Sequence, residues 1–210
     1  MASVRPRSRT ADSPIAERFL ATRALSEALV APLSESDATI QSMEDASPAK
    51  WHLAHTTWFW ETFLLRDHLD GYELHDERWP FLFNSYYECE GERIGRFSRG
   101  MLSRPSVEEL LGWRAAVTQA MEPLLDDGEL RPLIELGIAH EQQHQELLLT
   151  DVKHAFGLNP LRPEYAPQGR GHVSLWHRSP RCPDKHNSRD HRNRCTADQS
   201  RMQTARHRGS

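Results

Sequence analysis

The chain has 210 residues, a formal net charge of −4 and a hydrophobic fraction of 38%. This length suffices for one domain of medium size, with or without a tail. The hydrophobic fraction is low for a chain that is folded throughout, so we expect part of it to be unfolded. The net charge gives no reason to expect a nucleic acid as a partner.

The N-terminal segment, residues 1–12, is polar and is predicted to be a disordered leader. It contains Arg5, Arg7 and Arg9, but no apolar run follows them, so it lacks the pattern of a signal peptide. No stretch of the chain approaches the roughly 20 apolar residues that span a bilayer. We therefore expect a cytoplasmic protein that has no membrane partner.

Two helices are predicted in the first third of the chain. Apolar residues at three- and four-residue spacing predict a helix over residues 13–33. Residues 34–46 are polar and are predicted to be a connection. Ser47 can cap a helix and Pro48 fits a first helical turn, which predicts a second helix that runs to about His68.

A long loop precedes two further helices. Residues 70–105 contain scattered glycine and proline and lack helical period, so they are predicted to form a structured loop of the kind that carries function. A serine followed three residues later by glutamate, a capping-box pattern, predicts a third helix over residues 106–125. The fourth helix is predicted over residues 130–156, with Gly157 just beyond it as a stop. These helices predict an all-α four-helix bundle formed by residues 13–165.

The last segment, residues 166–210, differs in composition. From Pro167 to Ser210 there are nine Arg and one Lys against three Asp, so an acidic body carries a basic tail. Apolar residues are too sparse there to offset the entropy of ordering, and disorder is predicted. The three cysteines, Cys89, Cys182 and Cys195, show no CxxC spacing, which argues against a disulfide framework and a cysteine-rich zinc site.

The segment richest in chemistry is His140-Glu-Gln-Gln-His144, in the predicted fourth helix. Positions i and i+4 lie on one face of a helix, so the two imidazoles can bind one metal ion. The same residues fit the HExxH pattern of zinc metalloproteases, in which Glu141 would be the general base. The alternative is a polar helix face exposed to solvent. Apolar residues on both sides of the motif favour a position facing the bundle interior, where unsatisfied polar groups are costly.

A third ligand is expected from the predicted second helix, because bundles build metal sites from side chains on facing helices. His52 and His55 are three residues apart, and the spacing does not decide between them; for His52 we favour a capping or surface role near the helix start. Glu141 and Glu146 are expected to lie outside the ligand set, as partners of ligating imidazoles or in solvent. Imidazole suits iron, zinc, copper and nickel alike.

Four motifs begin, in chain order, at Ser47 (SPAKWHLAHTTWF), Phe83 (FNSYYE), Arg99 (RGMLSRP) and His140 (HEQQHQELLL). In this order they resemble motifs of the ergothioneine-biosynthesis sulfoxide synthases of the EgtB type. The similarity covers about residues 13–165. The fold that it implies is a DinB-like four-helix bundle, in agreement with the helical pattern.

The resemblance implies a non-haem iron(II) site with His55, His140 and His144 as ligands. It also implies that Arg96 and Arg99, which stand in an R-x-x-R-G pattern, bind substrate carboxylates, a task that suits the planar guanidinium. The reaction of that family is oxygen-dependent C–S bond formation and sulfoxidation, which joins cysteine or γ-glutamylcysteine to hercynine (trimethylated histidine). Three protein ligands suit this reaction, because the metal keeps positions open for thiolate and dioxygen.

Members of that family carry a second domain after the bundle, of the sulfatase-modifying-factor type, which supplies a catalytic tyrosine. Nothing after about Tyr165 resembles this domain, so we expect a truncated or frame-shifted product that is incomplete for catalysis by itself. Two alternatives stay open: a metal-binding helical bundle without turnover, and a zinc hydrolase that uses HExxH. The hydrolase is less favoured because His55 precedes the motif, whereas zinc proteases of this type take their third ligand from downstream.

Overall fold

The computed structural model describes residues 14–85, Tyr87 and residues 90–166. Within these residues the regular structure is helical and contains no strand, so the prediction of an all-α fold is confirmed. The predicted leader and nearly all of the predicted tail lie outside the described residues. In the described part of the chain, no helix combines the length and the apolar character needed to cross a bilayer.

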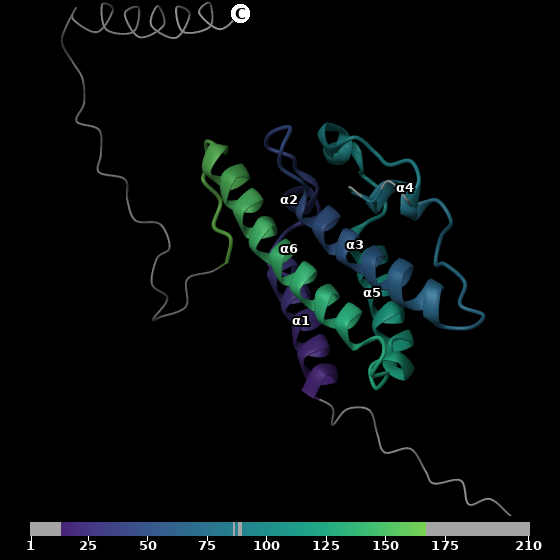
Figure 1. Cartoon of the computed structure of the whole chain (residues 1–210). Coiled ribbons are helices and arrows are strands. Elements are labelled where there is room, and N and C mark those ends of the chain that lie inside the picture. The colour runs from purple at the N-terminus through teal and green to yellow at the C-terminus, as the bar shows by residue number, and fades with distance from the viewer. Residues whose placement is uncertain (1–13, 86, 88–89, 167–210) are drawn as a thin grey trace, which may run out of the picture. The chain divides into compact units, whose positions relative to one another are not determined.

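Four long helices form the bundle shown in Figure 1: α1 (Pro14–Val30), α3 (Ala49–Trp60), α5 (Val107–Ala120) and α6 (Arg131–Leu158). Helix α3 contacts each of the other three, and α1 also contacts α5 and α6. Every residue of α3 is buried, as expected of a helix that has neighbours on all sides. The predicted four-helix bundle is therefore confirmed, with α3 as its central helix.

Short helices lie in two segments that were predicted to be irregular. The connection predicted over residues 34–46 contains α2 (Glu35–Thr39), which begins with a capping box between Ser34 and Asp37. The prediction missed this helix because its first turn is polar and the element is too short to show an apolar stripe. The loop predicted over residues 70–105 contains α4 (Trp79–Phe83) and the 3₁₀ helix η4 (Arg96–Met101).

The ends of the long helices differ from the predictions in detail. The second and third helices are extended by the π-helix η2 (Glu61–Arg66) and the 3₁₀ helix η5 (Glu122–Leu124). Gly157 was predicted to lie just beyond the fourth helix, but it lies inside α6, which ends at Leu158. The helix ends because of Pro160, since a residue before proline is disfavoured in the helical conformation. Asn159, the residue before Pro160, is accordingly extended.

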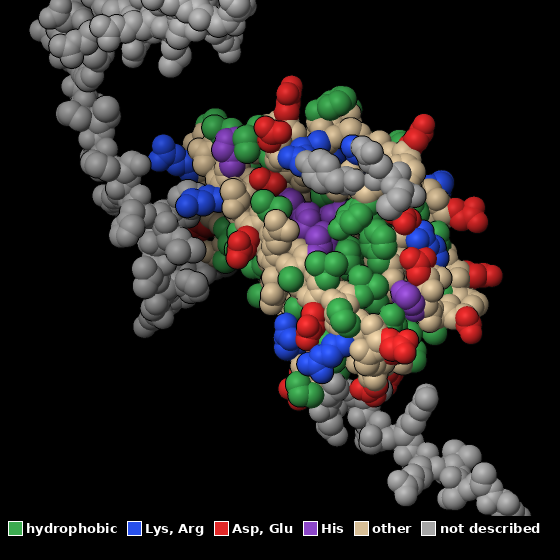
Figure 2. Space-filling view, in the orientation of Figure 1, with side chains coloured by type: hydrophobic (Ala, Val, Ile, Leu, Met, Phe, Trp, Pro, Cys, Tyr) green, Lys and Arg blue, Asp and Glu red, His purple; other side chains and the backbone are tan. Residues whose placement is uncertain are grey.

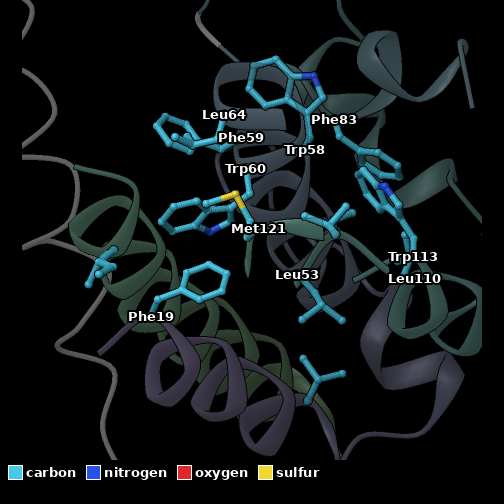
Figure 3. Packing of buried hydrophobic residues seen from close by; sticks show 14 of the residues in the cluster. Phe19, Leu53, Trp58, Phe59, Trp60, Leu64, Phe83, Leu110, Trp113 and Met121 are labelled. Atoms are coloured by element: carbon cyan, nitrogen blue, oxygen red, sulfur yellow. The ribbon is translucent and has the colours of Figure 1, made fainter. Parts of the chain in front are cut away.

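Aromatic side chains fill the centre of the bundle, as Figure 3 shows. The indole of Trp60 on α3 meets the ring of Phe19 on α1 edge-on, with 4.9 Å between the ring centroids. The same indole lies against Gly137 of α6, where a Cβ atom would stand 2.5 Å from the Trp60 ring. Helix α6 can approach α3 this closely because residue 137 has no side chain.

We expect Gly137→Ala to lower the free energy of unfolding by about 1–3 kcal/mol, because the added methyl group overpacks a rigid, buried indole. Urea denaturation measures this change. The matched control is Gly112→Ala in α5, where an added Cβ meets nothing within 4 Å. That control should stabilise the protein by about 0.5–1 kcal/mol, as alanine does in a helix interior. Equal effects of the two substitutions would contradict the close approach at Gly137.

One buried carboxylate ties the four long helices together. Glu141 of α6 is completely buried. Its oxygens accept hydrogen bonds from the Ser26 hydroxyl on α1 (2.6 Å) and the Trp60 indole N–H on α3 (2.8 Å). The guanidinium groups of Arg23 on α1 (3.2 Å) and Arg114 on α5 form ion pairs with the same carboxylate. Burial by itself raises the pKa of the Glu141 carboxyl, but the two arginines outweigh it and lower the pKa to about 2.

We expect Glu141→Gln to lower the free energy of unfolding by about 3–5 kcal/mol, because it leaves two buried guanidinium groups without their shared counter-charge. Urea denaturation again gives the measurement. The control is Glu146→Gln, an exposed position of the same helix, which should change the value by less than about 0.5 kcal/mol. A Glu141→Gln protein as stable as the wild type would refute this role of the carboxylate.

Candidate metal centre

Three histidines from two helices converge on one point. His55 lies on α3, and His140 and His144 lie one turn apart on α6. Each offers a ring nitrogen, and these three atoms lie within 4.8 Å of one another. Figure 2 shows histidine side chains recessed in the middle of the face where α3 and α6 run in Figure 1. The structure thus brings together the three residues predicted as ligands, a group that could hold a metal ion.

The orientation of His55 leaves its Nε2 atom free to bind a metal ion. Its Nδ1 lies 2.6 Å from the backbone carbonyl oxygen of Phe83. A carbonyl can only accept, so Nδ1 carries the proton and Nε2 keeps a lone pair. Nε2 of His140 lies 3.2 Å from this atom. Two nitrogens that each lie about 2.1 Å from one metal ion are about 3.0–3.4 Å apart at octahedral or tetrahedral angles, so this pair fits a shared ion.

All three imidazoles are held in the neutral form. Burial is the first cause for each, and it lowers the pKa of His140 to about 4. The neighbouring histidines add to burial at the other two: the pKa of His55 falls well below its usual value, and that of His144 falls to about 2. Neutral imidazole is the form that binds metal ions, so the donor set fits a metal such as iron or zinc.

His52 was predicted to cap its helix or to lie on the surface, and this prediction is wrong. The side chain is buried, with Nδ1 2.9 Å from Nδ1 of His144 and Nε2 3.0 Å from the Asp151 carboxylate. The reason is that even the first turn of the central helix α3 packs against α6 and has no exposed face. Asp151 was not predicted to be part of the site, although a position seven residues after His144 falls on the same helix face.

Glu141 lies outside the histidine group, as predicted, but it is not a partner of the imidazoles. Its side chain leaves a different face of α6 and ends among Arg23 and Arg114. A zinc hydrolase would need this carboxylate as a base beside the metal, and two ion pairs hold it elsewhere. The geometry therefore contradicts the hydrolase alternative. Glu146 is exposed, also as predicted.

A cavity of about 320 Å³ opens beside the three histidines. Its walls come from α3, α6 and the segment around η4, so it joins parts of the chain that are far apart in sequence. A larger and more open groove of about 670 Å³ lies along α2 and η4, and no histidine lines it. Among the residues that line the smaller cavity are four histidines, two arginines and two carboxylates: His52, His55, His140, His144, Arg96, Arg99, Asp45 and Asp151.

Arg99 is a buried cation in the wall of this cavity. Its guanidinium carbon lies 3.3 Å from the ring centroid of Trp51, which in turn stacks on His55 at 4.7 Å. The guanidinium donates to the hydroxyls of Ser47 (2.8 Å) and Ser85 (3.2 Å). Its Nε is buried without a hydrogen-bond partner, and no described carboxylate lies within ion-pair distance. Arg99 is therefore held rigidly while its charge lacks an ion-pair partner among the described residues.

Arg96 lines the same cavity from a more exposed position. Its guanidinium donates to the backbone carbonyl of Asp45 at 3.3 Å.

Burial and the neighbouring Arg96 and Arg93 lower the pKa of Arg99 to about 9. A bound anion would offset both effects, because it would add a negative charge beside the guanidinium. The structure thus places both predicted arginines at the cavity, Arg99 buried in its wall and Arg96 nearer the solvent.

The comparisons with known proteins agree with this architecture. A family model described as the DinB superfamily matches residues 18–148, which include the three histidines, the whole of α3 and the part of α6 up to residue 148. No curated protein matches the chain significantly. The match spans more than half of the chain. The chain therefore belongs to the DinB superfamily.

Proposed function

We propose that this bundle is the metal-binding part of a non-haem iron(II) sulfoxide synthase of the ergothioneine-biosynthesis type. The observation that carries the proposal is one cavity that combines three neutral imidazoles with a buried arginine, Arg99, which forms no ion pair with a described residue. The expected substrates are dioxygen, hercynine and a thiol, either cysteine or γ-glutamylcysteine. All of these are small molecules, and the two organic substrates carry carboxylates.

His55, His140 and His144 would hold the iron and leave positions open for ligands from solution. Bound iron(II) would supply the redox chemistry that couples reduction of dioxygen to C–S bond formation and sulfoxidation. The choice of iron over zinc or nickel rests on the four motifs at Ser47, Phe83, Arg99 and His140, because the donor set itself suits all three metals.

The arginines would orient the thiol substrate. A guanidinium pairs with the two oxygens of a carboxylate at once, which fixes the direction in which the rest of the molecule points. Arg99 is suited to this role because Ser47, Ser85 and Trp51 already hold it in place. A carboxylate bound there would place the thiol end of the substrate in the cavity that the histidines line. Arg96, nearer the solvent, would assist as a second cation.

We expect the wild-type chain, loaded anaerobically with iron(II), to bind one iron per chain, and His144→Ala to lose this stoichiometric binding. The physical reason is that two imidazoles bind iron(II) far more weakly than three. The control is His68→Ala, which removes an exposed histidine of the same domain. Iron is measured by elemental analysis after gel filtration. Equal iron retention in the two variants would refute the assignment of the ligands.

The same iron-loaded protein tests the reaction. Oxygen uptake that requires both a thiol and hercynine would support the sulfoxide synthase. Iron without such uptake is the result expected of the metal-binding part alone, whereas an iron-loaded protein that binds neither the thiol nor hercynine would overturn the proposal.

We expect Arg99→Lys to weaken the binding of γ-glutamylcysteine to the iron-loaded protein by about 10- to 100-fold, as loss of a bidentate, charge-assisted pair does. Lysine keeps the charge but cannot present the planar fork. Anaerobic isothermal titration calorimetry gives the dissociation constants. The matched control is Arg131→Lys, an exposed arginine of α6 that pairs with Glu135. Unchanged affinity in Arg99→Lys would contradict the role of this arginine.

A further inference from the structure

Two further polar side chains, the buried His52 and the partly buried Asp151, lie behind His144. The Nδ1 atoms of His144 and His52 are 2.9 Å apart, and Nε2 of His52 is 3.0 Å from an oxygen of Asp151. His52 is 4% exposed, so solvent does not substitute for either contact. The three side chains form a line that leads from the histidine group to a carboxylate, and neither the family match nor the motifs account for it.

The positions of the protons along this line follow from what each atom can do. A carboxylate only accepts, so Nε2 of His52 carries a proton and donates a hydrogen bond to Asp151. The neutral form of His52 then has a lone pair on Nδ1, which can only accept. Nδ1 of His144 must therefore carry the proton between the two rings. This leaves the lone pair of His144 on Nε2, the nitrogen that is free to face a metal ion.

The three histidines differ in what holds them. His55 donates to the backbone carbonyl of Phe83, which is a neutral acceptor. Nδ1 of His140 is buried without a hydrogen-bond partner among the described residues. Among the described residues, His144 is the one of the three that a charged group backs, Asp151 through His52. A metal-binding imidazole whose second nitrogen donates to a carboxylate-backed partner is fixed in tautomer and ring orientation, and it becomes a stronger donor.

We propose that His52, held by Asp151, is a positioning residue that fixes His144 in its metal-binding tautomer and orientation. This inference rests on the proposed metal site and adds two residues to it. Asp151 also connects the metal site to the wall of the cavity. The Asp151 carboxylate accepts from the backbone N–H of Ser47 at 2.8 Å, and the hydroxyl of Ser47 holds Arg99. One connected set of hydrogen bonds thus runs from His144 to the cation that faces the same cavity.

Two substitutions at position 52 separate this role from simple packing. His52→Asn places a carbonyl oxygen where Nδ1 stood, so it keeps the acceptor for His144 but is smaller than histidine. His52→Leu fills more of the space but offers no acceptor. If packing alone mattered, the leucine variant would keep more of the metal affinity than the asparagine variant. If the hydrogen-bond acceptor matters, the asparagine variant keeps more of it.

The probe is cobalt(II) alone, added to the full chain under anaerobic conditions and followed by its visible absorption. We expect His52→Leu to raise the dissociation constant of cobalt(II) by about 10- to 100-fold, as loss of an outer partner of a metal ligand does. His52→Asn should stay within a few-fold of the wild type and keep its absorption spectrum. A His52→Leu variant that binds cobalt(II) as tightly as His52→Asn, or more tightly, would overturn the proposal.

Asp151→Ala gives a second, independent test. We expect it to weaken cobalt(II) binding several-fold in the wild-type background and to have no further effect in the His52→Leu background, because Asp151 acts through His52. Additive effects in the double variant would overturn the proposal. Thermal unfolding of each variant shows that the comparison is made between folded proteins.

The outcomes also distinguish this inference from the proposed function. If the wild type binds one cobalt(II), His144→Ala abolishes binding and the His52 variants have no effect, the metal site stands and His52 is not a positioning residue. If the wild type binds no cobalt(II), both proposals fail together.

Discussion

The fold depends on one buried carboxylate. Glu141 receives hydrogen bonds or ion pairs from α1, α3 and α5, and it is itself part of α6, so a single side chain sets the distances between all four long helices. An ionised group in such a place is tolerated only when its partners satisfy it completely, which Arg23 and Arg114 do here. The arrangement fixes how α6 is rotated about its axis, and this rotation decides which of its residues meet α3.

Helix α6 therefore serves two purposes on different faces. Glu141 points into the packed interior, whereas His140 and His144 point toward His55 and the cavity. Gly137 lets the helix approach Trp60 closely one turn earlier. The bundle can thus be rigid where the histidines are anchored while an opening remains at their other side. A metal site with three protein ligands and room for substrates needs both properties at once.

The polar residues around the cavity form a continuous assembly and are not a set of separate contacts. His144, His52 and Asp151 are connected, Ser47 links Asp151 to Arg99, and Trp51 lies against both Arg99 and His55. Such a network restrains each ligand through its neighbours, so a change at one end can alter geometry at the other. Metal binding and carboxylate binding would share this framework.

Local patterns in the sequence determined the long helices and the histidines of α6, because helix period and i,i+4 spacing are properties of a short segment. They also placed the capping box of α5, while the same signal at α2 was missed in a segment with no apolar stripe. The partners of His144 could not be derived in this way. Whether His52 is buried, and whether Glu141 faces a metal or two arginines, depends on how α6 is rotated against α1, α3 and α5. That rotation is set mainly by contacts between residues about 80 to 120 positions apart, such as Arg23 with Glu141 and Ser47 with Asp151, and only the tertiary structure decides them.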